Sequence, residues 1–144
     1  MSLFLQLQRV LVLTVVISGA PLLGARSKFV RNNVAADRDY PAALAAANRF
    51  LHAWQERDHE TGILMLTDEA KQHTSEALLD GFFLPETASR RAHEVVRGRK
   101  LNKSRYSFPV ALFESAGKAR SVPRYSQIIV VKDAQAEWSV DKMP

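Results

Sequence analysis

The spacing of apolar residues changes near residue 90, and no other feature of the sequence constrains the fold more. Before this point apolar residues recur every three or four positions. That repeat predicts amphipathic helices over 41–58, around 63–66 and from a cap at Thr67 to about Gly81. Asp39 is a possible cap for the first of them.

Beyond residue 90 apolar and polar residues alternate, as they do in half-buried strands. The alternation predicts four strands, at 93–101, 106–114, 122–132 and 137–142. Helices followed by a meander of strands indicate an α+β fold. We therefore expect the helices to pack on one face of a curved antiparallel sheet of about four strands.

The N-terminal segment is expected to direct export. Residues 10–25 carry no charge and follow Arg9, an order typical of a signal peptide. The stretch is shorter than the roughly 20 apolar residues of a spanning helix, although counting from residue 3 lengthens it. We predict a signal peptide or inner-membrane anchor at 1–25, a linker at 26–38 and a periplasmic domain at 39–144. A packed N-terminal helix is the alternative.

Basic residues gather directly after the change in spacing. Residues 32–144 hold 16 basic and 15 acidic side chains, so the domain as a whole lacks the excess of positive charge that favours nucleic acid. Its helical half is acidic and its strand half basic. The densest basic stretch comprises Arg90, Arg91, Arg97, Arg99, Lys100, Lys103 and Arg105. We expect it either to bind an anionic envelope surface or acidic protein, or to complement the acidic helices.

Candidate metal ligands are weak. His52, Glu56 and His59 follow i, i+4 and i+7 spacing on the first helix, but they lie opposite its apolar face and should be solvated. His73 and His93 stand alone, which favours structural roles. The chain has no cysteine, so disulfides and thiol nucleophiles are excluded. We predict no metal site and no cofactor.

Two segments carry a family resemblance. A-N-R-F-L-H-A-W-Q-E-R-D at 47–58, with G-I-L-M-L-T-D-E-A after it, resembles the opening helices of the nuclear transport factor 2-like superfamily. S-Q-I-I-V-V-K-D-A-Q-A-E-W-S-V-D at 126–141 resembles its closing strands. This superfamily includes ketosteroid isomerases and SnoaL-like cyclases, and small exported or membrane-anchored bacterial members also occur in it. The resemblance covers about residues 40–144 and implies a cone-like fold.

The resemblance also implies where acid–base chemistry would occur, because enzymes of this superfamily use groups that point into the cone. Asp58, Tyr106 and Tyr125 are the candidate catalytic residues by position. The fold hosts enzymes and scaffolds alike, so it does not decide the function. With no catalytic motif in the chain, we expect a non-enzymatic envelope domain that binds a partner or ligand. The alternative is a small lyase or isomerase with its site between the first helix and the sheet.

Overall fold

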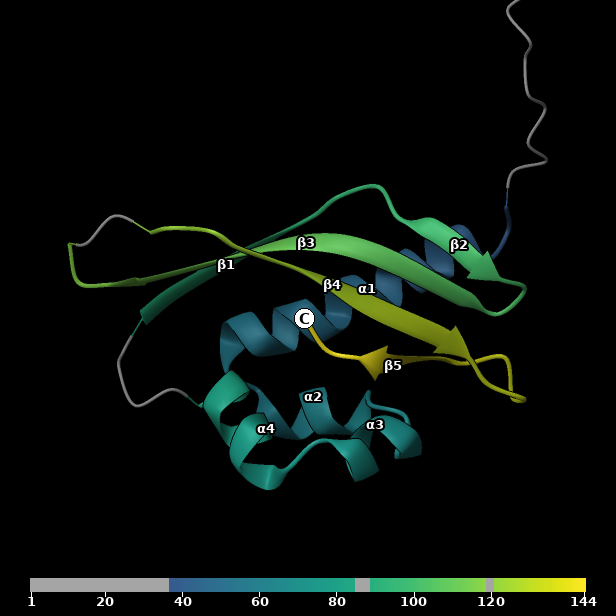
Figure 1. The fold of residues 1–144 in the computed structure, drawn as a ribbon, viewed down its shortest axis with the longest axis horizontal. Helices are drawn as coiled ribbons and strands as arrows, with labels where there is room; N and C mark the ends of the chain where they lie inside the picture. Colours follow the sequence, from purple (N-terminus) through teal and green to yellow (C-terminus); the bar gives the residue numbers. More distant parts are fainter. Residues whose placement is uncertain (1–36, 85–88, 119–120) are drawn as a thin grey trace, which may run out of the picture. The chain divides into compact units, whose positions relative to one another are not determined.

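The computed structural model describes residues 37–84, 89–118 and 121–144. The predicted signal or anchor segment at 1–25 and all of the predicted linker except its last two residues lie outside these ranges. Within the described ranges, no helix is long and apolar enough to cross a membrane. The predicted α+β architecture is confirmed: helices pack against a curved antiparallel sheet (Figure 1).

The first helix, α1 (Tyr40–Glu56), covers the sheet. Pro41 occupies its first turn, where a missing N–H costs nothing. The predicted cap, Asp39, makes no side-chain capping bond; its carboxylate instead accepts a hydrogen bond from Lys132 Nζ at 2.9 Å. The helix ends where Arg57 turns left-handed, with φ 61°.

Three short helices follow: α2 (His59–Leu64), α3 (Asp68–His73) and α4 (Glu76–Phe83). The single helix predicted from Thr67 to about Gly81 is wrong, because Thr74 and Ser75 are extended and divide it. Thr67 caps α3 as predicted, by accepting a bond from the Ala70 N–H, and Ser75 caps α4 in the same way. In Figure 1, α1 lies between the sheet and the group formed by α2, α3 and α4.

The sheet contains β1 (Ser89–Val95), β2 (Arg99–Asn102), β3 (Arg105–Ala116), β4 (Arg124–Lys132) and β5 (Trp138–Lys142). The strand order is β1–β3–β4–β5, and β2 extends the β1 edge by pairing with β3. On the opposite edge, the segment between α2 and α3 bonds to β5, with Thr67 N donating to Val140 O at 2.8 Å.

The predicted strand at 93–101 is divided into β1 and β2, because the chain leaves the regular ladder at Val96–Gly98. Gly98 lies so close to β3 that an added Cβ would approach the Phe108 ring within 2.3 Å and the Ser107 carbonyl within 2.8 Å. Only a residue without a side chain fits there, and the strand is interrupted at that point.

The core fills the space between α1 and the sheet. The prediction that Tyr106, Phe108, Val110 and Leu112 share one face of β3 is confirmed, since all four lie in the core. Ser107 and Ala111 between them are buried as well. The four core residues meet the apolar side of α1, including the fully buried Phe50 and Trp54, and Trp138 from β5. The place expected for an enzymatic site in a lyase or isomerase is therefore occupied by aromatic side chains.

We predict that Gly62→Ala destabilises the domain by about 1–3 kcal/mol, because its Cβ would lie 2.1 Å from the Phe83 ring. Gly81→Ala is the matched control: nothing lies within 4 Å of its added Cβ, and alanine in a helix should stabilise by about 0.5–1 kcal/mol. Urea unfolding of both variants measures the difference. Equal stability of the two variants would contradict the close packing of α2 on α4.

Candidate functional site

A pocket of about 610 Å³ lies where α3 and α4 face the ends of the sheet strands and the C-terminal residues. We call it the α3–α4 pocket. Its apolar wall is formed by Trp54, Ala70, Ala77, Leu78, Phe82 and Met143. Its polar wall includes Glu69, His73, Glu114, Arg124, Asp141 and Lys142. Polar residues are thus about as numerous as apolar ones, which makes this pocket more polar than most small-molecule sites.

Two of the three side-chain carboxylates in this wall form ion pairs with arginines. Glu114 accepts a hydrogen bond from Arg91 Nε at 2.9 Å. Asp141 accepts bonds from Arg105 and, at 3.1 Å, from Thr67 Oγ1. Both carboxylates are thus already paired, whereas a general base must be able to reach and accept a proton of the substrate. The pocket therefore offers a binding surface more readily than acid–base catalysis.

Arg91 does not line the pocket, but it bonds to residues that do. Its side chain is only 1% exposed, so the prediction that it belongs to a binding surface is wrong. Nη1 donates to the carbonyls of Trp54 at 2.7 Å and Phe83 at 2.9 Å, and Nη2 donates to Phe82 O at 2.9 Å. The guanidinium also lies over the Trp54 ring, 4.7 Å from its centre. Burial lowers the pKa of Arg91, and the carboxylate of Glu114 opposes that shift.

Carbonyls at a helix C-terminus lack partners within the helix and carry partial negative charge. Arg91 satisfies such carbonyls on α1 and α4 together, and so fixes both helix ends to β1. Its position inside the fold explains why sequence reasoning misplaced it. Residues 91, 93 and 95 alternate onto the inner face of β1. This alternation is the feature of the sequence that could have indicated a buried Arg91.

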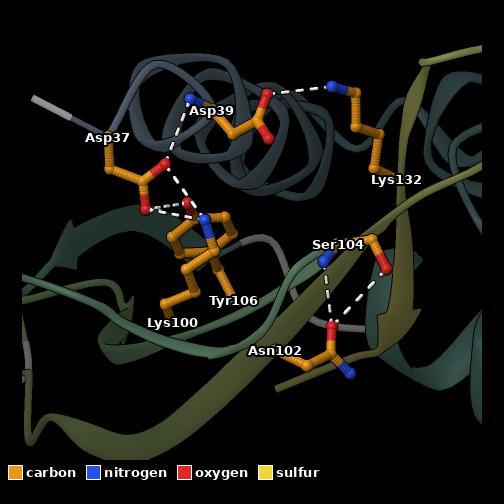
Figure 2. A network of polar contacts seen from close by, with 7 residues as sticks. All are labelled: Asp37, Asp39, Lys100, Asn102, Ser104, Tyr106 and Lys132. Carbon is orange, nitrogen blue, oxygen red and sulfur yellow. Dashed lines mark hydrogen bonds and ion pairs between the residues drawn. The ribbon is translucent and has the colours of Figure 1, made fainter. Parts of the chain in front are cut away.

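A second polar cluster holds the beginning of the domain (Figure 2). The Asp37 carboxylate accepts hydrogen bonds from the Tyr106 hydroxyl and from Lys100 Nζ, the latter at 3.0 Å. These bonds lower the pKa of Asp37, with Tyr106 as the larger cause and Lys100 as the next. Burial raises the pKa of Tyr106, and hydrogen bonds with Tyr106 and Asp37 raise that of Lys100. We call Asp37, Lys100 and Tyr106 the Asp37 clasp.

The three candidate catalytic residues are not brought together. Asp58 is exposed and caps α2, and the hydrogen bond from Thr61 lowers its pKa. Tyr106 is buried in the clasp, whereas Tyr125 is 79% exposed on the outer face of the sheet. None of the three is among the residues that line the α3–α4 pocket.

The predicted basic set divides into paired and exposed members. Besides Arg91, Lys100 pairs with Asp37 and Arg105 with Asp141. The remaining four, Arg90, Arg97, Arg99 and Lys103, are exposed. Ion pairs thus link the acidic half to the basic half at Asp37–Lys100 and Asp39–Lys132.

His73 lines the α3–α4 pocket, whereas His52, His59 and His93 do not. His52 and Glu56 lie on α1, but His59 begins α2 after the turn at Arg57, so the three do not form one helical row. His59 Nε2 lies 3.3 Å from the Asp80 carboxylate. His93 faces α1 with Nδ1 buried, and burial, followed by nearby His52, lowers its pKa. No three potential ligands gather at a metal-binding distance in the described ranges.

Neither a family model nor a curated protein matches this sequence. Solved structures share its fold, at low sequence identity. A ketosteroid isomerase-like protein from Erwinia carotovora atroseptica is 19% identical, covers 72% of this chain and 91% of its own, and has a TM-score of 0.54. A structure described as a putative calcium/calmodulin-dependent protein kinase type II association domain, from Thiobacillus denitrificans, is 14% identical, with coverages of 70% and 90% and a TM-score of 0.56.

A third similar structure is a domain with a cystatin-like fold from Nostoc punctiforme. It is 14% identical, covers 72% of this chain and 74% of its own, and has a TM-score of 0.57. These structures confirm the predicted cone-like α+β fold. At these identities the comparisons leave function to be argued from the residues themselves.

We predict that Arg91→Met destabilises the domain by about 3 kcal/mol, because three buried carbonyls lose a charged donor. Arg91→Lys should recover only part of the loss, since one ammonium group cannot reproduce the fork of a guanidinium. Arg90→Met, next in sequence and exposed, should stay within about 0.5 kcal/mol of wild type. Thermal or urea unfolding measures all three, and equal losses at positions 90 and 91 would contradict the role of Arg91.

The Asp37 clasp predicts a pH-dependent contribution to stability. The folded-state pKa of Asp37 lies below its unfolded value, so the charged carboxylate stabilises the fold above pH of about 4. This stabilisation is lost as the pH falls through the folded-state pKa. Wild type should therefore be more stable than Asp37→Asn near neutral pH, and the difference should shrink on acidification. Urea unfolding of both proteins between neutral and acid pH checks this; a constant difference would contradict it.

Proposed function

We propose that this cone-shaped domain is a non-enzymatic binding module that takes a small amphipathic molecule in the α3–α4 pocket. The observation that carries the proposal is the pocket itself, whose volume of about 610 Å³ falls within the range of about 300–1,000 Å³ of known ligand sites. Phe82 supplies flat apolar surface and rests against the fully buried Trp54 ring, and Ala77 and Leu78 line the α4 side of the pocket.

The charges around the pocket favour a ligand with an anionic group. Glu114 and Asp141 are neutralised by Arg91 and Arg105. Arg124 and Lys142 remain at the rim as exposed cations, against Glu69 as the remaining acid. An amphipathic molecule could place its apolar part against α4 and its anionic group toward Arg124.

Binding fits this pocket better than catalysis does. Enzymatic acid–base chemistry needs a titratable group whose proton is free to move at the reacting atoms. Here two of the three side-chain carboxylates in the pocket wall are paired with arginines, and the candidate residues Asp58, Tyr106 and Tyr125 lie elsewhere. The space between α1 and the sheet is filled by the core.

The apolar segment at 10–25 supports a location for this module outside the cytoplasm. There it would act either as a free periplasmic binder or attached to the inner membrane through residues 3–25. Intact mass measured after separating membrane and soluble fractions distinguishes these two states, because cleavage removes the segment.

We predict that Ala77→Phe weakens binding of anilinonaphthalene sulfonate, an apolar aromatic anion, by about tenfold or more, since the ring would occupy space in the pocket beside α4. Arg124→Gln should weaken it by about fivefold through loss of the rim charge. Ala134→Phe, in the exposed turn before β5, is the matched control and should bind as wild type does. Fluorescence titration measures each affinity.

Near-ultraviolet circular dichroism confirms that each variant keeps its tertiary packing, because this dye also binds partly unfolded proteins. Unchanged binding by folded Ala77→Phe would contradict a ligand site between α3 and α4.

A further inference from the structure

The corner of the sheet at β2 presents basic and apolar side chains together. Arg97, Arg99 and Lys103 are exposed there. Val96 and Leu101 in the same stretch are 49% and 42% exposed. We call these five residues the β2 corner. No ion pair involves its three basic residues within the ranges that the structure describes, in contrast to neighbouring Lys100 and Arg105.

The β2 corner is also the place where the preceding chain joins the domain. Asp37, the first described residue, is held by Lys100 of β2 and by Tyr106 of β3 (Figure 2). Tyr40, at the start of α1, accepts a hydrogen bond from Gly98 N at 3.1 Å. Contacts from Gly98, just before β2, and from Lys100, within β2, therefore hold the start of the domain beside the exposed basic residues.

The sequence before residue 37 indicates which kind of surface the β2 corner would contact. The apolar stretch at 10–25 is flanked by Arg9, Arg26, Lys28 and Arg31. Residues 26–36 can extend at most about 40 Å, so a membrane that held the apolar stretch would lie near the attachment point. Basic residues are attracted to anionic head groups, and exposed apolar side chains can enter the interface beside them.

We propose that the β2 corner docks on an anionic lipid surface. Arg97, Arg99 and Lys103 contact the head groups, and Val96 and Leu101 enter the interface. None of these residues lines the α3–α4 pocket, so docking leaves the pocket open to a ligand. This inference is independent of what the pocket binds.

The absence of cysteine allows a direct test in the full chain. A single Leu101→Cys carries an environment-sensitive fluorophore, and the protein is mixed with vesicles of phosphatidylcholine, with or without phosphatidylglycerol. A quencher attached to the lipid head groups should reduce the emission on the anionic vesicles only. The effect should disappear at 1 M salt, where the Debye length is about 3 Å. A label at Gln72→Cys on α3 should remain unquenched on both.

Substituting Arg97, Arg99 and Lys103 by Gln should lower the ratio of docked to undocked domains by about 100-fold, since each basic residue near the surface contributes about fivefold. The matched control substitutes Arg49, Arg90 and Lys118, which are exposed elsewhere, and should dock as wild type does.

Three results would overturn the proposal. The first is a Leu101 label that stays unquenched on anionic vesicles. The second is equal loss of docking in the two triple variants. The third is docking that requires an added acidic protein in place of lipid.

Discussion

The arrangement of the whole domain depends on one buried cation. Arg91 lies on the inner face of an edge strand and donates hydrogen bonds to carbonyls at the ends of α1 and α4. The Trp54 carbonyl also accepts a longer bond from Arg57 N at 3.3 Å, and losing the charged donor Arg91 at these carbonyls would be costly in a protein interior. Because one side chain satisfies them together, the two helices end at a fixed distance from the sheet. The α3–α4 pocket exists in the space beyond that junction.

The same residue links stability to the character of the pocket. Glu114 balances the charge of Arg91 and stands in the pocket wall. Thr67 and Arg105 hold Asp141 from the other side. Glu114 and Asp141 therefore stabilise the fold through these ion pairs, and Arg124 and Lys142 are the exposed cations of the wall. A ligand in the pocket would contact a surface that is already rigid, which lowers the entropic cost of binding.

The sequence predicted the layers of this fold because hydrophobic periodicity reports directly which faces are buried. Tyr106, Phe108, Val110 and Leu112 share one face of β3, as expected. Local conformation was predicted less well: Thr74 and Ser75 divide α3 from α4, and Gly98 interrupts the edge strand at a contact with Phe108. Such breaks depend on tertiary neighbours, which a single sequence does not display. The same reason explains Arg91. As one of a run of basic residues it was expected on the surface, and only its tertiary neighbours show that it is buried.

The Asp37 clasp also affects how the domain bears mechanical load. Asp37 is tied to β2 and β3, and Asp39 is tied to Lys132 of β4. Tension from the preceding chain is thereby shared among three strands before it reaches the first turn of α1. Each of these ion pairs joins partly exposed side chains and is individually weak. The resistance of this junction to a pulling force therefore depends on several bonds acting together.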